Sequence, residues 1–121
     1  MIRLKKRVDF VRIAKQGQKW VSPGLIVQAM RRPILHSGED QGPRFGFTAS
    51  KKVGNAIKRN KAKRRMRALV QAFMDQADKN LDFVLIARQS TVDYDFQKLA
   101  GEVETAFKKL PKIVEKKGKK G

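Results

Sequence analysis

Apolar residues follow a helical spacing near the start of the chain and a strand-like pattern directly after it. Residues 8–16 carry an imperfect apolar stripe of helical period, and Gly17 stands where a glycine commonly ends a helix. Residues 20–30 are rich in β-favouring side chains and are interrupted by Ser-Pro-Gly at residues 22–24. The pattern predicts a helix followed by two strands.

A loop and a third strand come next. Residues 31–43 contain two prolines and two glycines, which is typical of a loop. From Arg44 to Ser50, Phe45 and Phe47 alternate with smaller residues, as in a strand with one apolar face. We interpret both phenylalanines as core residues.

The second half of the chain contains two helical stripes and one continuous apolar run. Asn55 is placed to cap the first helix, and Asp82 to Arg88 enclose a run typical of a strand buried on both faces. Asp93 or Asp95 can cap the last helix, which Pro111 is expected to end. The stripes consist of Ala62, Met66, Leu69, Val70, Phe73 and Ala77, and of Phe96, Leu99, Ala100, Val103, Ala106, Phe107 and Leu110.

The predicted order is helix, strand, strand, strand, helix, strand, helix. This order indicates an α+β fold, an α/β sandwich of one domain in which helices pack on a four-stranded mixed sheet. We expect the domain to span residues 1–110. Residues 111–121 are rich in lysine and glycine, and we expect them to form a basic, disordered tail.

The composition excludes several classes of protein. The 121 residues contain no cysteine, so disulfides, thiolate metal sites and a cysteine nucleophile are excluded. No apolar run reaches the roughly 18 residues of a membrane-spanning helix, and the N-terminus lacks the apolar segment of a signal peptide. We therefore expect a cytoplasmic protein that binds no membrane.

The charge indicates a polyanionic partner. Lys and Arg number 29 and Asp and Glu number 11, which gives a net charge of +18. Residues 51–67 contain nine of these bases and no acid, whereas a solvated helix face normally mixes both signs. Residues 1–19 and 108–121 each carry a net +6. Nucleic acid is the first candidate among polyanions.

The acid-free segment places its cations in order along a helix. At 100° per residue, Arg59, Lys63 and Arg67 form a ladder with steps of about 6 Å, close to the spacing of phosphates along a strand. Asn60 and Arg64 fall in the same arc. Gly54 and the helix start that follows it suit an anion, but the nucleotide-binding pattern G-x-x-x-x-G-K-[ST] is absent.

The run from Arg44 to Arg67, RFGFTASKKVGNAIKRNKAKRRMR, resembles the signature of the bacterial ribonuclease P protein subunit. Lys5 to Phe10 resembles the entry to that family's first helix, and Asp82 to Arg88 its last strand. The resemblance covers roughly residues 4–110. It implies a left-handed crossover around the basic helix, although right-handed connections are the rule.

The resemblance implies that the chain, as a monomer with one copy per RNA, binds a catalytic RNA and promotes endonucleolytic removal of the 5′ leader of precursor tRNA. The family's Arg-Asn-Arg signature reads Arg59-Asn60-Lys61 here, and lysine lacks the planar fork of arginine. The residues implied to bind the RNA subunit are Asn55, Arg59, Asn60, Lys61, Lys63, Arg64 and Arg67.

The resemblance also implies a leader-binding cleft between the first helix and the sheet. Phe10 matches an aromatic residue of that cleft, while Ala14 and Gln28 stand where relatives carry aromatic residues. From the sequence, Phe10 suits either the core or base stacking. The residues implied to bind the leader are Phe10, Lys51, Lys52 and Arg88.

The sequence offers no set of protein groups for nuclease chemistry. His36 is the only histidine, and seven of the eleven acids lie in residues 68–107. We expect no catalytic or metal-binding residue in the protein, with Mg²⁺ bound mainly by the RNA subunit as the resemblance implies. The composition alone equally fits a structural RNA-binding protein of the ribosome or an assembly factor. A membrane-surface protein would need a wider apolar face opposite the basic one.

Overall fold

The computed structural model describes residues 1–33 and 42–118, and the predicted loop around His36 and the last three residues lie outside this description. Short 3₁₀ turns at Lys51–Val53, Met74–Gln76 and Gln89–Val92 connect the longer elements. The helices and strands are β1 (Ile2–Arg3), α1 (Arg7–Gln16), β2 (Gln18–Val21), β3 (Leu25–Arg31), β4 (Arg44–Thr48), α2 (Ala56–Phe73), β5 (Leu81–Ala87) and α3 (Phe96–Gly118).

The strands form one mixed sheet in the order β1-β4-β5-β3-β2. β4 pairs in parallel with β1 and β5, whereas β3 pairs antiparallel with β5 and β2. The sheet therefore has five strands, and the prediction of four was wrong by one. The two-residue strand Ile2–Arg3 is too short to show an alternating pattern, and only the free edge of β4 makes it a strand.

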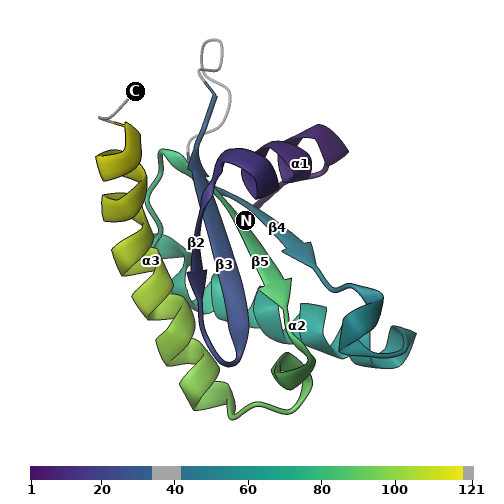
Figure 1. The fold of residues 1–121 in the computed structure, drawn as a ribbon. Helices are drawn as coiled ribbons and strands as arrows, with labels where there is room; N and C mark the ends of the chain where they lie inside the picture. The colour runs from purple at the N-terminus through teal and green to yellow at the C-terminus, as the bar shows by residue number, and fades with distance from the viewer. Residues whose placement is uncertain (34–41, 119–121) are drawn as a thin grey trace.

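The helices cover the two faces of the sheet unequally. α1 packs on one face against β3 and β5, while α2 and α3 cover the other face (Figure 1). In the view of Figure 1, β4 and β5 point downward, β5 lies to the left of β4, and α2 passes behind the sheet. This arrangement makes the β4-α2-β5 connection left-handed, as the resemblance implied, against the general preference.

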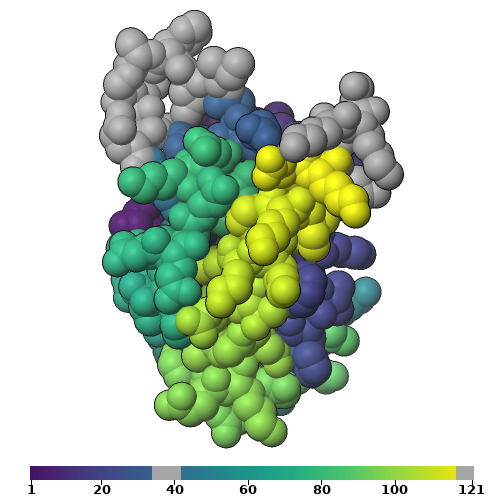
Figure 2. All heavy atoms as spheres, turned by 90° about the vertical axis from the view of Figure 1, so that its left-hand side faces the viewer, coloured from purple at the N-terminus to yellow at the C-terminus, as the bar shows by residue number. Residues whose placement is uncertain are grey.

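The main core lies between the sheet and the pair α2 and α3. Phe45 and Phe47 are buried in it, which confirms their interpretation as core residues, and Phe45 and Phe83 stack with centroids 5.6 Å apart. The helical stripe of α2 is buried as predicted at Ala62, Met66, Leu69 and Val70. Figure 2 shows α3 running across the molecule between the end of α2 and β2. This core holds the basic helix rigidly against the sheet.

The last helix is longer than predicted. Asp95 caps its start, because the Asp95 carboxylate accepts hydrogen bonds from the backbone N–H groups of Gln97 and Lys98. The prediction that Pro111 ends the helix was wrong, since α3 continues to Gly118. Val114 is buried in the main core, and its burial offsets the backbone hydrogen bond that proline cannot donate.

Candidate nucleic-acid interface

The turn between β4 and α2 determines where the basic helix begins. Gly54 has φ of 142°, a backbone conformation that side chains with a Cβ rarely adopt. The Asn55 side chain then accepts a hydrogen bond from the Lys58 N–H at 3.0 Å, as its predicted capping role requires. The same turn leaves the side chains of Lys51 and Lys52 exposed beyond the end of β4.

One flank of α2 carries the predicted cationic arc. Arg59, Lys63 and Arg67 are half-buried along the side of the apolar stripe, and Asn60 and Arg64 are exposed beside them. Within the described residues, no hydrogen bond or ion pair joins these five side chains to another part of the chain. Their donors are therefore available to an external anion.

Lys61 and Arg65 lie on the opposite flank of α2. Arg65 donates to the backbone carbonyls of Thr91 and Val92 at 3.0 and 2.6 Å, so its guanidinium holds the turn after β5 against the helix. Lys61 pairs with Asp93 at 3.4 Å in an exposed ion pair. The two flanks of α2 therefore differ: the cations of the arc form no hydrogen bond or ion pair with another part of the chain among the described residues, whereas Lys61 and Arg65 contact the turn after β5. We call the first the outward flank.

The face of the sheet on which α1 packs is only partly covered. Val84 is buried beneath α1 with Leu4 and Ile13. The register places Gly46 and Gln28 beside Val84, with Lys19 next to Gln28. One step further along the strands, a second row is half-buried or exposed, and it consists of Val21, Ile26, Ile86 and Thr48. We call this partly exposed row, with Gln28 and Lys19, the open face.

Phe10 lies at the border between the covered part and the open face. Its ring is half-buried and rests directly on Gly46 of β4, where an added Cβ would lie 2.6 Å from two ring carbons. Ala14, one turn further along α1, is exposed. Phe10 is therefore neither a fully buried core residue nor a free aromatic, because one part of the ring packs and another part remains accessible.

The other residues implied to bind the leader lie at the far end of the open face. Arg88 follows β5 and donates to the Ser22 carbonyl at 2.8 Å in the turn between β2 and β3. Arg88 is the fourth residue after Val84, a distance of about 13 Å along an extended strand. Lys51 and Lys52 follow the neighbouring strand at the same end. Phe10 and these cations therefore bracket the open face.

An ion-pair network beneath α1 was not predicted. Asp82 has no exposed surface and accepts two hydrogen bonds from Arg44, at 2.8 and 2.7 Å. It also accepts one from Arg12 of α1 at 2.8 Å. The sequence contained one signal of this network: Asp82 stands at the start of a strand buried on both faces, and a buried carboxylate needs cationic partners. Those partners lie 70 and 38 residues away.

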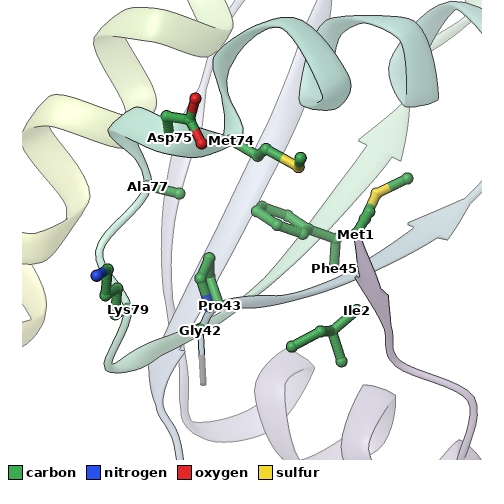
Figure 3. A pocket seen from close by; sticks show the side chains of 9 residues that line it. All are labelled: Met1, Ile2, Gly42, Pro43, Phe45, Met74, Asp75, Ala77 and Lys79. Carbon is green, nitrogen blue, oxygen red and sulfur yellow. The ribbon is translucent and has the colours of Figure 1, made fainter. Parts of the chain in front are cut away.

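A small pocket of about 250 Å³ lies away from both regions, between β1 and the turn after α2 (Figure 3). No residue predicted to bind RNA lines it. Its lining is mainly apolar and consists of Met1, Ile2, Gly42, Pro43, Phe45, Met74, Asp75, Ala77 and Lys79. Among the described residues, no three His, Cys, Asp or Glu side chains lie close enough together to hold a metal ion. No helix within residues 1–33 and 42–118 is long and apolar enough to cross a membrane.

Comparison with known proteins agrees with this arrangement. A family model described as Ribonuclease P matches residues 1–111. The chain belongs to this family. It is 44% identical over 112 residues to the ribonuclease P protein component of Paramagnetospirillum magneticum, covering 89% of this chain and 81% of the relative. It is 41% identical over 109 residues to the ribonuclease P protein component of Gluconacetobacter diazotrophicus, and the match covers 88% of this chain and 89% of the relative.

Solved structures of ribonuclease P proteins share the fold. The protein from Staphylococcus aureus superposes with a TM-score of 0.73 at 30% identity, covering 91% of this chain and 97% of that one. The protein from Thermotoga maritima superposes with a TM-score of 0.73 at 27% identity, and the match covers 89% of this chain and 96% of that one. Membership makes the chain a protein subunit of ribonuclease P, an endoribonuclease holoenzyme of tRNA 5′ processing in which it partners an RNA subunit.

Proposed function

We propose that the outward flank of α2 binds the catalytic RNA subunit of ribonuclease P and that the open face binds the 5′ leader of precursor tRNA. The observation that supports this most is the separation of two surfaces. The flank of α2 carries cations without internal partners, and the open face carries uncovered apolar residues beside Phe10. A folded, highly ordered RNA suits the first surface, and a single strand suits the second.

Arg59, Lys63 and Arg67 contact successive phosphates of the RNA subunit. Arginine binds phosphate with a planar fork and lysine with a point charge, so the flank combines orientation with attraction. Asn60 and Arg64 widen the contact on the exposed side. Asn55 contributes by starting the helix at the right residue, since its side chain is occupied by the Lys58 N–H. Lys61 contributes least, because it lies on the other flank beside Asp93.

The leader crosses the open face as an extended strand. The accessible side of Phe10 stacks a base, and the half-buried row of Ile26, Ile86 and Thr48 contacts the next nucleotides. Lys51, Lys52 and Arg88 then neutralise leader phosphates at the far end. Because Ala14 and Gln28 supply no second ring, we expect weak stacking, at the lower end of about 1–3 kcal/mol per base.

The chemical step belongs to the RNA subunit, which binds the Mg²⁺ ions used for phosphodiester hydrolysis. The protein contributes position and charge neutralisation: it holds the substrate leader and lowers the repulsion between two RNAs. One protein monomer serves each RNA subunit.

Cleavage of a 5′-extended tRNA at low Mg²⁺ tests the proposal, with protein alone, RNA alone and both together. We expect rapid leader removal only with both components. Cleavage by protein that has been rigorously freed of RNA would contradict the assignment of the chemistry. Light scattering of the assembled particle measures the one-to-one stoichiometry in the same samples.

A further inference from the structure

Asp82 connects three segments on the α1 side of the sheet. Its carboxylate accepts hydrogen bonds from Arg12 of α1 and from Arg44 of β4, and Nε of Arg32, just after β3, lies 3.8 Å from Oδ1. The Arg12 and Arg44 side chains are only 20% and 15% exposed. The buried carboxylate of Asp82 would lose much of its favourable interaction energy if one of these arginine side chains moved away. The network therefore restricts where α1 can lie.

α1 has few other contacts that determine its position. Ile13 is its only fully buried residue, and Val8 and Val11 are 66% and 38% exposed. Phe10 precedes Arg12 by two residues and rests on Gly46. A helix held by one apolar residue and one half-buried ring can shift or rotate, but a guanidinium bound to a buried carboxylate resists that motion.

We propose that Asp82 is a positioning residue for leader binding that acts through Arg12. The Arg12–Asp82 pair keeps α1 at the place where the Phe10 ring sits on Gly46 with its other side toward the open face. Asp82 has no exposed surface, so it acts without touching RNA. The inference rests on the proposed role of Phe10 in binding the leader.

The test uses Arg12→Met in the assembled holoenzyme, because Asp82→Asn would leave three guanidinium groups together without their anion. Affinity is measured for precursor tRNAs with leaders of one and five nucleotides. We expect at least a threefold loss for the long leader, less than a twofold change for the short one, and an unchanged cleavage rate at saturating substrate. Arg7→Met removes the same charge from an exposed site of the same helix and is expected to affect both leaders equally and slightly.

Two further variants separate positioning from direct contact. Arg12→Met combined with Phe10→Ala should lose no more long-leader affinity than Phe10→Ala alone, because both changes remove one interaction. Arg12→Lys should restore part of the affinity, since lysine can still pair with Asp82. Additive losses in the double variant would mean that Arg12 contacts the leader itself and would overturn the proposal.

The position of α1 is measured in the free protein as well. The chain has no native cysteine, so spin labels on Lys15→Cys and Lys108→Cys report the distance between α1 and α3. Arg12→Met should broaden that distance distribution, and Arg7→Met should not. An unchanged distribution refutes the positioning role. If the distribution broadens but Phe10→Ala shows no dependence on leader length, the proposed leader site fails instead.

Discussion

Gly46 determines where Phe10 lies. A side chain at this position of β4 would occupy the space of the Phe10 ring, so only glycine allows the ring to approach the strand backbone. The contact holds one side of the ring, and the ring as a whole stays half-buried. A single residue without a side chain thus converts a phenylalanine of α1 into a supported aromatic surface.

Phe10→Ala should reduce holoenzyme affinity for a five-nucleotide leader by several-fold and leave a one-nucleotide leader nearly unchanged, because only the longer leader reaches the ring. Since Phe10 is half-buried, the free energy of unfolding should fall by about 2 kcal/mol, less than the roughly 3–5 kcal/mol of a fully buried phenylalanine. Substrate titrations and urea unfolding measure the two effects. Equal losses for both leaders would show that the ring serves the fold only.

Gly46→Ala should displace the Phe10 ring, because the new Cβ would lie 2.6 Å from two of its carbons. We expect a several-fold loss of long-leader affinity and a destabilisation of about 1–3 kcal/mol from overpacking. Gly101→Ala is the control, because no atom beyond its chain neighbours and its own helix backbone lies within 4 Å of that Cβ, and alanine favours a helix by up to about 1 kcal/mol. Unchanged leader binding by Gly46→Ala would argue against a role for the contact between the Phe10 ring and Gly46 in leader binding.

The surface of helix α2 has three parts: one stripe packs in the core, one flank carries the cations that we propose to bind RNA, and the other flank contacts the rest of the fold. Met66 and Leu69 are buried, Arg65 holds the turn after β5, and Arg59 and Lys63 have no internal partner in the described part of the chain. The three surfaces follow from the helical period, which fixes the angles between these side chains. The turn at Gly54 and the cap at Asn55 determine the residue at which the helix begins.

Affinity for the RNA subunit should fall steeply with salt, with a log–log slope of about −0.7 to −0.9 per neutralised phosphate. Arg59→Ala and Arg64→Ala should each weaken binding and reduce the slope by about one phosphate contact. Lys61→Ala, on the other flank, should change the slope less. Filter binding across a salt series provides the measurement, and equal slopes for all three variants would contradict the division of α2 into two flanks.

At the scale of the whole molecule, Asp82 joins parts of the chain that are distant in sequence. Arg12 and Arg44 precede it by 70 and 38 residues, and both donate to its carboxylate. The network covers the α1 side of the sheet, which has a much smaller apolar cluster than the side covered by α2 and α3. We therefore expect the ion pairs at Asp82 to help hold α1 on the face where apolar packing is sparse.

Asp82→Asn should therefore destabilise the chain by about 3–5 kcal/mol, as expected when one member of a buried ion-pair network is removed. Asp93→Asn is the matched control, because the Asp93 side chain is 87% exposed and its ion pair with Lys61 should contribute at most about 1 kcal/mol. Chemical denaturation of the free protein gives both values. A loss below about 1 kcal/mol for Asp82→Asn would mean that apolar contacts alone hold α1.

Local patterns in the sequence determined most of the elements of this protein and the outward flank of its basic helix. The helical period placed Ala62 and Met66 in the core and Arg59 and Lys63 beside it, and alternation buried Phe45 and Phe47. These properties depend on the spacing of residues that are close together in the chain, and that spacing can be read directly from the sequence.

Only the tertiary structure determined the remaining features, because those features depend on contacts between residues that are distant in the sequence. β1 exists only because β4 offers an edge, and α3 continues past Pro111 because Val114 reaches the core. The resemblance implied that Lys61 binds RNA, and only the tertiary structure shows its ion pair with Asp93 in the turn after β5. The same holds for Phe10, whose partly buried ring rests on Gly46, 36 residues further along the chain. It holds as well for the ion pair between Arg12 and Asp82, which no local pattern predicts.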